Sequence, residues 1–396
     1  MPGESAMRSK GSRPVRVLTA GGEIELKRPY FWGKGLGGAC PADESVGIEQ
    51  GRTSPGARRI LCRLGMVEDF GDAAEDAGRI GNIPVCKEKL RLLVEAEAAT
   101  IAWYRDNGTL RAAWTSADAK VKTGTGVLTR VYAGVDGVMV PMVTAVEKEK
   151  RRKNQSIRRR QRSAAGVGNA RALAPARAGS DERFKEMKIG LFYDQAKKHR
   201  HAFVTENNHK AFGPLLKEHA AQVAFEQADE SISLTDGARW IANQICRILL
   251  LIKMMMLDFY HLSQHIHETA KCCLGETGDA KDWAAARLKE LKELGVTPVL
   301  AAIDTLAKKV RSQAKHKSLR KLRNYVVSRM EMLDYRGALA KDWDIGSGPT
   351  EAMCKNLTLR LKRPGMKWDR DHAGAMMNLT AMYESGQAKA YWAMAA

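Results

Sequence analysis

The sequence predicts an α/β protein in which helices cover a mixed β-sheet. Strand-like apolar segments come first and then alternate with helical segments between residues 129 and 258. That order is typical of a mixed sheet and not of an alternating doubly wound repeat. A helical stretch without strands follows from Leu262 to about Leu339. With 396 residues, 44% of them apolar, the chain is long enough for two or three domains with substantial cores.

The charge balance predicts a polyanionic partner, most often a nucleic acid. The chain has 65 Lys and Arg against 45 Asp and Glu, a formal charge of +20. The longest apolar run, Ile248 to Leu257, contains Lys253 and is far shorter than the roughly 20 residues of a spanning helix, so no membrane partner is expected. No signal-peptide pattern opens the sequence, and its seven cysteines include no Cys-x-x-Cys pair. We therefore expect a cytoplasmic, nucleoid-associated protein with reduced thiols.

The N-terminal third divides into two parts. Residues 1–53 are rich in Gly and Pro without an apolar period, which predicts a poorly ordered or degenerate segment. Residues 54–125 predict a helical DNA-binding domain, in which two helices separated by Gly81 to Pro84 have the outline of a helix-turn-helix. The second helix carries Lys87, Lys89 and Arg91 on its first turns, where DNA contacts are usually made. Most helix pairs bind nothing, so the net charge is a necessary part of this interpretation.

The first part of the predicted core covers residues 126–261. Its first apolar segment predicts two short strands that meet near Asp136, and further strands are expected at 187–193, 202–205, 232–236 and 254–258. A solvated basic insertion at 147–180 interrupts it, with nine Lys and Arg against one Glu between Lys148 and Arg162. Such a segment suits a phosphate-binding flap. The helical insertion at 262–344 and the C-terminal part at 345–396 complete the predicted division.

Three acidic residues stand where carboxylates could converge at one edge of a sheet. Asp136 lies in the first strand pair, Asp236 at a strand end, and Glu351 near the start of a helix after Gly346-Ser-Gly348. Hard oxygen ligands of this kind bind Mg²⁺, and two such ions support phosphoryl transfer. Taken singly, a hairpin turn, a helix cap and a first-turn acid are the commoner explanations of these residues.

The segment after Glu351 strengthens the metal interpretation. At helical spacing Lys355 and Lys362 share a face with Glu351, so that a ligand is followed by cations for a phosphate backbone. Arg363, with Pro364 and Gly365, is expected to end this helix. The indole of Trp368 could stack on a base, but a place in the core is the favoured interpretation.

The same residues carry a family resemblance. The ordered set GVDGVMVP (134–141), SLTDGARWI (233–241), LDFYH (257–261) and IGSGPTEAMCKNLTLRLKRPGMKW (345–368) resembles bacterial insertion-sequence transposases of the ISKra group, which are relatives of the Mutator-like DDE enzymes. The resemblance covers roughly residues 54–385. It implies a ribonuclease-H-like core with a large all-helical insertion and a catalytic, metal-binding triad of Asp136, Asp236 and Glu351.

The resemblance also implies accessory and missing features. Asp258 and His261 match an accessory Asp-x-x-His motif. The nearby His265, His267, Cys272 and Cys273 invite a zinc interpretation, although histidines four apart on a helix more often pack or face solvent. In this family a Cys-x-x-Cys precedes the Gly/Pro segment. Here only Cys40 follows Arg28 to Gly35, so a zinc-ribbon-like end is expected to be degenerate or absent.

The expected function is therefore metal-dependent nicking of DNA at element ends followed by strand transfer. Two Mg²⁺ ions are expected as cofactors, with Mn²⁺ as a possible substitute, and double-stranded DNA of the terminal inverted repeats and the target as partner. Synapsis of two ends implies at least a homodimer. Two rivals stay open: a domesticated DNA-binding protein without catalysis, and a structure-specific nuclease whose reaction ends at hydrolysis.

Overall fold

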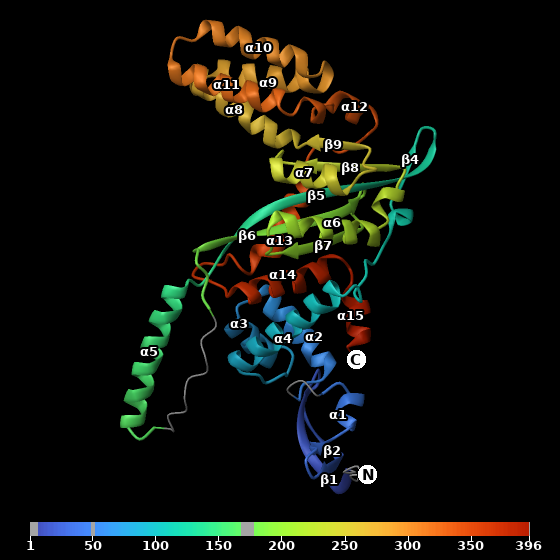
Figure 1. The fold of residues 1–396 in the computed structure, drawn as a ribbon, viewed down its shortest axis with the longest axis vertical. Helices are drawn as coiled ribbons and strands as arrows, with labels where there is room; N and C mark the ends of the chain where they lie inside the picture. Colours follow the sequence, from blue (N-terminus) through green and yellow to red (C-terminus); the bar gives the residue numbers. More distant parts are fainter. Residues whose placement is uncertain (1–6, 49–51, 168–177, 396) are drawn as a thin grey trace. The chain divides into compact units, whose positions relative to one another are not determined.

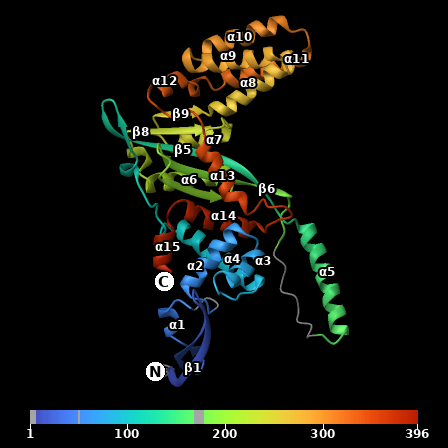
Figure 2. The same ribbon diagram turned by 180° about the vertical axis from the view of Figure 1, so that it is seen from behind.

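A computed structural model describes residues 7–48, 52–167 and 178–395 of the chain, which divides into two compact units. Unit 1 comprises Met1–Arg111, Met139–Glu186 and Asn356–Ala396. Unit 2 comprises Ala112–Val138 and Met187–Lys355. Figures 1 and 2 show the chain from opposite sides. No helix of the described part is long and apolar enough to cross a membrane.

Unit 2 is built on a mixed sheet with the strand order β7-β6-β5-β8-β9. The strands are β4 (Lys120–Thr123), β5 (Gly126–Pro141), β6 (Phe184–Asp194), β7 (Arg200–Thr205), β8 (Glu230–Thr235) and β9 (Met254–Leu257). Strands β6 and β7 are antiparallel, β5 and β8 are parallel, and so are β8 and β9. Strand β4 forms a short antiparallel hairpin with the start of β5. The mixed α/β class that the sequence predicts is confirmed.

Different elements cover the two faces of this sheet. Helices α6 (His209–Gln222) and α7 (Arg239–Ile248) pack on one face, where Val131, Ala133 and Val135 of β5 join their apolar cluster. The first turns of α13 (Gly348–Leu359) lie on the opposite face, against Gly134 and Asp136 (Figure 2). Side chains alternate along a strand, so the even-numbered residues of β5 face α13.

The segment between β9 and α13 is helical, as the sequence predicts. Its elements are α8 (Phe259–Leu274), α9 (Gly278–Glu293), α10 (Val296–Lys309), α11 (Gln313–Val327), the short η3 (Met330–Met332) and α12 (Tyr335–Ala340). Figure 1 shows α8 to α11 grouped together. The helices of this segment share one apolar cluster that includes Leu262, Ile303 and Leu322. This cluster continues to Leu257 at the end of β9, so the helical insertion packs directly on the sheet.

Unit 1 contains a helical group and an N-terminal sheet. Its helices are α1 (Ala42–Ser45), α2 (Pro55–Val67), α3 (Phe70–Arg79), α4 (Lys87–Asp106), α5 (Ala145–Ala164), α14 (Arg370–Glu384) and α15 (Ala388–Met394). The side chains of Ser54 and Asp69 accept hydrogen bonds from the first turns of α2 and α3, which explains where those helices begin. The charge block of the basic insertion forms α5, which buries no residue. Residues 168–177 of that insertion lie outside the described part.

The expectation of a poorly ordered N-terminus is wrong for its described residues. Strands β1 (Arg8–Thr19), β2 (Gly22–Gly33) and β3 (Gly37–Ala39) form an antiparallel sheet. The turn between β1 and β2 has only two residues, Ala20 and Gly21, and Gly22 adopts a φ of +109°. A two-residue turn at glycines is a hairpin signal that the weak apolar pattern obscured. Residues 1–6 and 49–51 lie outside the described part.

Two further predictions need correction. Strand β5 runs without a break through Asp136 and Gly137, where two strands were expected to meet. A two-residue hairpin there would need positive φ angles, and Gly137 is not among the positive-φ residues. Helix α13 ends at Leu359, before Arg363, because the amides of Leu361 and Lys362 both bond to the carbonyl of Thr358 and tighten the chain into turns. Lys362 therefore does not share a helix with Glu351.

Candidate active site

The parallel register of β5 and β8 places Asp136 and Asp236 together. The paired residues run from Arg130 with Glu230 to Gly134 with Leu234, an offset of 100 residues. Asp136 and Asp236 each stand two residues beyond the last of these pairs and have the same parity. They therefore belong to the same face and the same end of the sheet. Both side chains are half-buried.

Helix α13 brings the third acid to this face. A Cβ atom on Gly134 would lie 1.9 Å from Oγ1 of Thr350, so the glycine lets the helix approach the strand. The thiol of Cys354 donates to Oδ2 of Asp136 at 3.5 Å. Glu351 lies between these two contacts on the helix and is exposed. The helix that bears Glu351 thus packs on the face of β5 that bears Asp136.

The side chains of the two aspartates accept hydrogen bonds from backbone amides that follow them. Oδ1 of Asp136 accepts the Gly137 amide at 2.6 Å, and Oδ1 of Asp236 accepts the Ala238 amide at 2.8 Å. Within the described part of the chain, no group of three or more His, Cys, Asp or Glu side chains is arranged to hold a metal ion. Carboxylate oxygens on neighbouring strands nevertheless fit Mg²⁺ in donor chemistry.

Asp258, directly after β9, differs from the three predicted acids in being fully buried. The register of β8 with β9 ends at Thr235 and Leu257, so Asp258 stands one residue beyond, beside Asp236. Its carboxylate accepts the His261 amide at 2.7 Å and the Ser347 amide at 2.5 Å, and it also accepts the Ser347 hydroxyl. Asp258 is 1% exposed. This saturated, buried carboxylate fixes the loop that precedes α13, which makes it a positioning residue for Glu351.

One residue of α11 and one residue of the turn after it hold the backbone of the second acid. The Tyr325 hydroxyl donates to the Asp236 carbonyl at 3.0 Å, and Arg329 donates to the Gly237 carbonyl at 2.7 and 3.1 Å. Gly237 has a φ of +78°, and a Cβ atom there would lie 2.5 Å from Nε of Arg329. Burial raises the pKa of Tyr325 to about 12, so its hydroxyl stays a donor at neutral pH. The helical insertion therefore orients Asp236.

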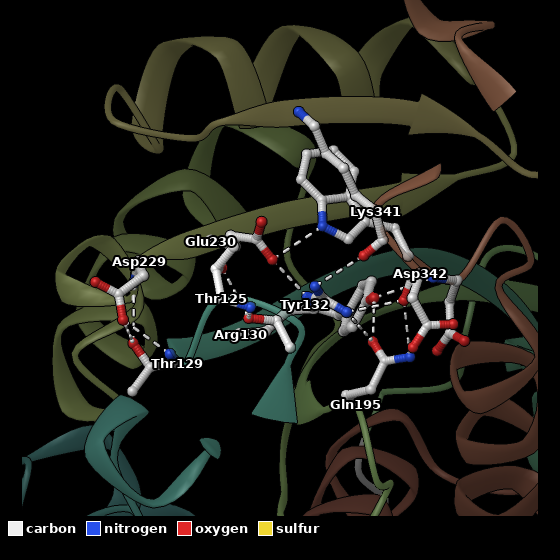
Figure 3. Close-up of polar contacts among 12 residues, drawn as sticks. Thr125, Thr129, Arg130, Tyr132, Gln195, Asp229, Glu230, Lys341 and Asp342 are labelled. Carbon is white, nitrogen blue, oxygen red and sulfur yellow. Dashed lines mark hydrogen bonds and ion pairs between the residues drawn. The ribbon is translucent and has the colours of Figure 1, made fainter. Parts of the chain in front are cut away.

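A buried arginine anchors the chain where it returns from the helical insertion (Figure 3). Arg130 is 1% exposed and donates to the Glu230 carboxylate at 2.6 Å. It also donates to the carbonyls of Lys341 at 3.0 Å and Asp342 at 2.8 Å. The indole of Trp343 donates to the same Glu230 oxygen at 2.9 Å. We refer to Arg130, Glu230 and the backbone of residues 341–343 as the Arg130 clamp.

The Arg130 clamp lies on the face that α13 covers. Its arginine is an even-numbered residue of β5, like Gly134 and Asp136. Thr129 and Asp229 reinforce the register beside it: the Thr129 amide donates to the Asp229 carboxylate at 2.8 Å, and the Thr129 hydroxyl does so at 2.9 Å (Figure 3). These donors lower the pKa of Asp229. The clamp thus fixes both the register of the two strands and the start of the path to α13.

Comparison with known proteins places most of unit 2 in a family. The model of an uncharacterised protein family, UPF0236, matches residues 198–395. The chain belongs to this family. No curated protein matches the sequence significantly.

The UPF0236 match includes two of the three predicted acids. Asp236 and Glu351 lie inside it, as do Asp258 and His261, whereas Asp136 lies before it. The matched region also includes Tyr325 and Arg329, which hold the backbone after β8. The part of the site contributed by β5 is therefore defined by the structure and not by the family match.

The histidines after β9 pack against an aromatic side chain. The rings of His261 and His265 are 5.1 Å apart, and His265 lies 4.4 Å from the ring of Tyr325. Burial, followed by the nearby His261, lowers the pKa of His265. Cys273 is buried, which raises its pKa to about 11. These contacts favour packing, the commoner explanation, over the zinc interpretation.

The residues predicted to bind DNA fall into different environments. Lys87 and Lys89 are exposed on the first turn of α4, and Lys355 is exposed one turn after Glu351. Arg91, in contrast, forms ion pairs with Glu88 and Glu95, each at 2.6 Å. Its guanidinium is thus already engaged. Lys362 and Arg363 lie in the turns after α13, Lys362 exposed and Arg363 half-buried.

Sequence reasoning missed the residues that position the acids. Arg130 carried a usable signal, since a charged residue inside an apolar strand needs a buried partner. Its partner Glu230 follows at the same 100-residue offset as Asp136 and Asp236. Tyr325 and Arg329 gave no such signal, because they lie at the end of a helix with many exposed cations and in the turn that follows it. The favoured core interpretation of Trp368 agrees with its exposure of 6%.

Proposed function

We propose that this protein is a DNA transposase of an insertion sequence, of the ISKra group of Mutator-like DDE enzymes, with Asp136, Asp236 and Glu351 as its catalytic acids. The observation that carries the proposal is the shared face of these residues. The β5–β8 register supports the pairing of the two aspartates, and the contact of Cys354 with Asp136 supports the place of the helix that bears Glu351.

The strand order supports a ribonuclease-H-like core. Three strands that follow one another in the chain occupy one side of the sheet as β7-β6-β5, and β8 and β9 extend it in parallel on the other side. The helical segment between β9 and α13 then corresponds to the family's insertion between the second and third acids. Helices α2 to α4 are proposed as the DNA-binding module, with Lys87 and Lys89 as its exposed cations.

The three acids would hold two Mg²⁺ ions, or Mn²⁺ in their place. When bound, such ions lower the pKa of water and stabilise a leaving oxygen on phosphorus. Asp136 lies within β5 and Asp236 directly after β8, and Asp258 and Arg329 hold the adjoining backbone, so the carboxylates are oriented before DNA arrives. Lys355, on the same side of α13 as Glu351, offers a charge to a phosphate.

The proposed reaction has two balanced steps. Water attacks a phosphorus at the element end, the bond to the 3′ oxygen breaks, and that oxygen takes up a proton to leave a 3′-hydroxyl. The 3′-hydroxyl then loses its proton and attacks a phosphorus of the target DNA, and the bond from that phosphorus to the target's 3′ oxygen breaks, which leaves the displaced oxygen as a protonated 3′-hydroxyl. No covalent protein–DNA intermediate is needed, because no serine or tyrosine acts as nucleophile. Joining two ends requires at least a dimer.

A strand-transfer assay with pre-nicked element ends, target DNA and Mg²⁺ tests the proposal. Asp136→Asn is expected to lower joining at least 100-fold while DNA retention stays unchanged, since the substitution preserves shape but removes a ligand charge. Asp282→Asn, an exposed position on α9, is the matched control and should join DNA as the parent does. Cleavage without joining would indicate a nuclease. Retention without either reaction would indicate a DNA-binding protein, and both outcomes contradict the proposal.

A further inference from the structure

Unit 1 contains a polar pocket that the proposed active site does not use. Its volume is about 470 Å³, and its walls come from the starts of α3 and α4, from α5, and from the segment between α13 and α14. Five lining residues are cationic and three are carboxylates. The cations are Lys87, Arg91, Arg151, Arg360 and Lys367, and the acids are Asp69, Glu95 and Asp369.

Arg360 in the wall of this pocket is a buried charge without a carboxylate partner. It is 3% exposed, and its guanidinium lies 4.8 Å from the ring centre of Phe70 and 5.1 Å from that of Trp368. Its hydrogen bonds go to the Gly65 carbonyl at 3.3 Å and to the Met366 sulfur at 3.4 Å. Burial lowers its pKa to about 10, which leaves the group charged at neutral pH.

A second donor in the same wall has no partner. Nε1 of Trp368 is buried and makes no hydrogen bond within the described part of the chain. A buried charge without an opposite charge and a buried N–H without an acceptor both cost stability. An anion that accepts hydrogen bonds would satisfy both groups. The pocket therefore has the chemistry of a binding site whose ligand is an anion.

The rest of the lining favours phosphate over a carboxylate. Arg91 and Lys367 are already paired with glutamates, but Lys87 and Arg151 form no ion pair with any described residue. Together with Arg360 they leave three cations for one ligand. A group with more than one negative oxygen uses several cations at once, and the planar fork of arginine matches phosphate geometry.

We propose that this pocket binds a phosphate group, with Arg360 and the Trp368 indole as donors in its wall and Lys87 and Arg151 as cations at its edge. The phosphate belongs either to a DNA backbone, in which case the inference rests on the proposed function, or to a free phosphate compound. In both cases Arg360 binds the phosphate, and its burial without a carboxylate partner lowers the stability of the folded protein.

The test uses the full chain and two probes. The first is the thermal unfolding midpoint in inorganic phosphate compared with chloride at equal ionic strength. The second is the anisotropy of a fluorescein-labelled DNA duplex over a range of KCl concentrations. Arg360→Met removes the charge but keeps an apolar chain between the rings, and Arg360→Lys keeps the charge without the fork. Arg79→Met, an exposed position on α3, is the matched control.

We expect Arg360→Met to lose the upward shift that phosphate produces, with a midpoint in chloride equal to or above that of the parent. If the phosphate is that of DNA, duplex affinity also falls roughly tenfold and the slope of log K against log salt decreases by about one. A lost phosphate shift with unchanged DNA affinity assigns the pocket to a free phosphate compound. Arg360→Lys should keep part of the shift, and Arg79→Met should keep all of it.

Two outcomes would overturn the inference. One is a phosphate shift that survives in Arg360→Met. The other is a midpoint that falls sharply in chloride for both Arg360 variants while phosphate still raises it, because Arg360 would then be structural. If Arg360→Met does not fold, Arg360→Lys decides by the same criterion. Since these assays measure binding, they can be run on the Asp136→Asn protein, and a failed strand-transfer reaction does not affect them.

Discussion

Arg130 in unit 2 and Arg360 in unit 1 are both arginines that the fold removes from solvent, with 1% and 3% of their surfaces exposed. Arg130 has a carboxylate and two carbonyls as acceptors. Arg360 has one carbonyl, one sulfur and two aromatic rings. Oxygen atoms of the chain, including a carboxylate, accept the hydrogen bonds of Arg130. Arg360 has no carboxylate among its partners. The difference separates a charge that maintains the fold from a charge that the fold retains for a ligand.

The comparison also applies to the acids of unit 2. Asp258 is buried and accepts three hydrogen bonds, whereas Asp136, inside β5, and Asp236, directly after β8, are half-buried. A buried carboxylate is closed to a metal ion from solvent, and a half-buried one keeps access to solvent. Burial therefore distinguishes Asp258 from the two candidate ligands.

The largest expected effect comes from removing the guanidinium group of the Arg130 clamp. Arg130→Met leaves the half-buried Glu230 beside an apolar side chain and frees the carbonyls of Lys341 and Asp342. Breaking a buried pair in this way costs about 3–5 kcal/mol. Hydrogen exchange should accelerate in residues 341–355, measured by mass spectrometry, while Arg336→Met at an exposed position of α12 leaves it unchanged. Equal protection in both variants would remove the distinction between the two arginines.

A smaller effect is expected where α13 contacts β5. A Cβ on Gly134 would overlap Oγ1 of Thr350, so Gly134→Ala should destabilise unit 2 by about 1–3 kcal/mol. Oγ1 of Thr350 is buried without a hydrogen-bond partner, so Thr350→Ala alone should cost little. The double variant should recover part of the loss in urea unfolding. Additive losses would mean that the close approach does not hold α13.

The smallest effect is expected at the hydrogen bonds between Thr129 and Asp229, beside the Arg130 clamp. Thr129 donors lower the pKa of Asp229, so this group stabilises the fold above the ordinary aspartate pKa of about 4, and the contribution is lost as pH falls through the lower, folded-state pKa. Thr129→Val removes the hydroxyl donor. Its stability deficit should therefore be complete at neutral pH and shrink below pH ~4 in denaturant titrations.

The control for this pH dependence is Asp229→Asn. In that background residue 229 carries no carboxylate that titrates. Thr129→Val should therefore lower the free energy of unfolding by an amount that is independent of pH. A deficit that instead grows as the pH falls would show that the hydroxyl does not act through the Asp229 carboxylate. The register would then depend on the Arg130 clamp alone.

Local features of the sequence were sufficient for most of the helices and for the mixed sheet. Apolar periods and polar caps such as Asp69 and Asn208 mark where most helices lie, and the strand–helix order predicts the mixed sheet. The three acids were also recognisable from their positions after strands and before a helix. These signals are short-range, because capping and amphipathic patterning depend on residues within one or two turns.

Tertiary structure decided the rest. The unbroken β5 and both buried arginines depend on contacts between segments far apart in the chain, such as Arg130 with Asp342 and Arg360 with Gly65. The N-terminal hairpin and the early end of α13, in contrast, depend on local turns that the apolar pattern did not reveal. Whether a charge is saturated by the chain is a property of such contacts. Composition and periodicity carry no record of them, because the same arginine is compatible with a solvated surface, a structural clamp or a ligand pocket.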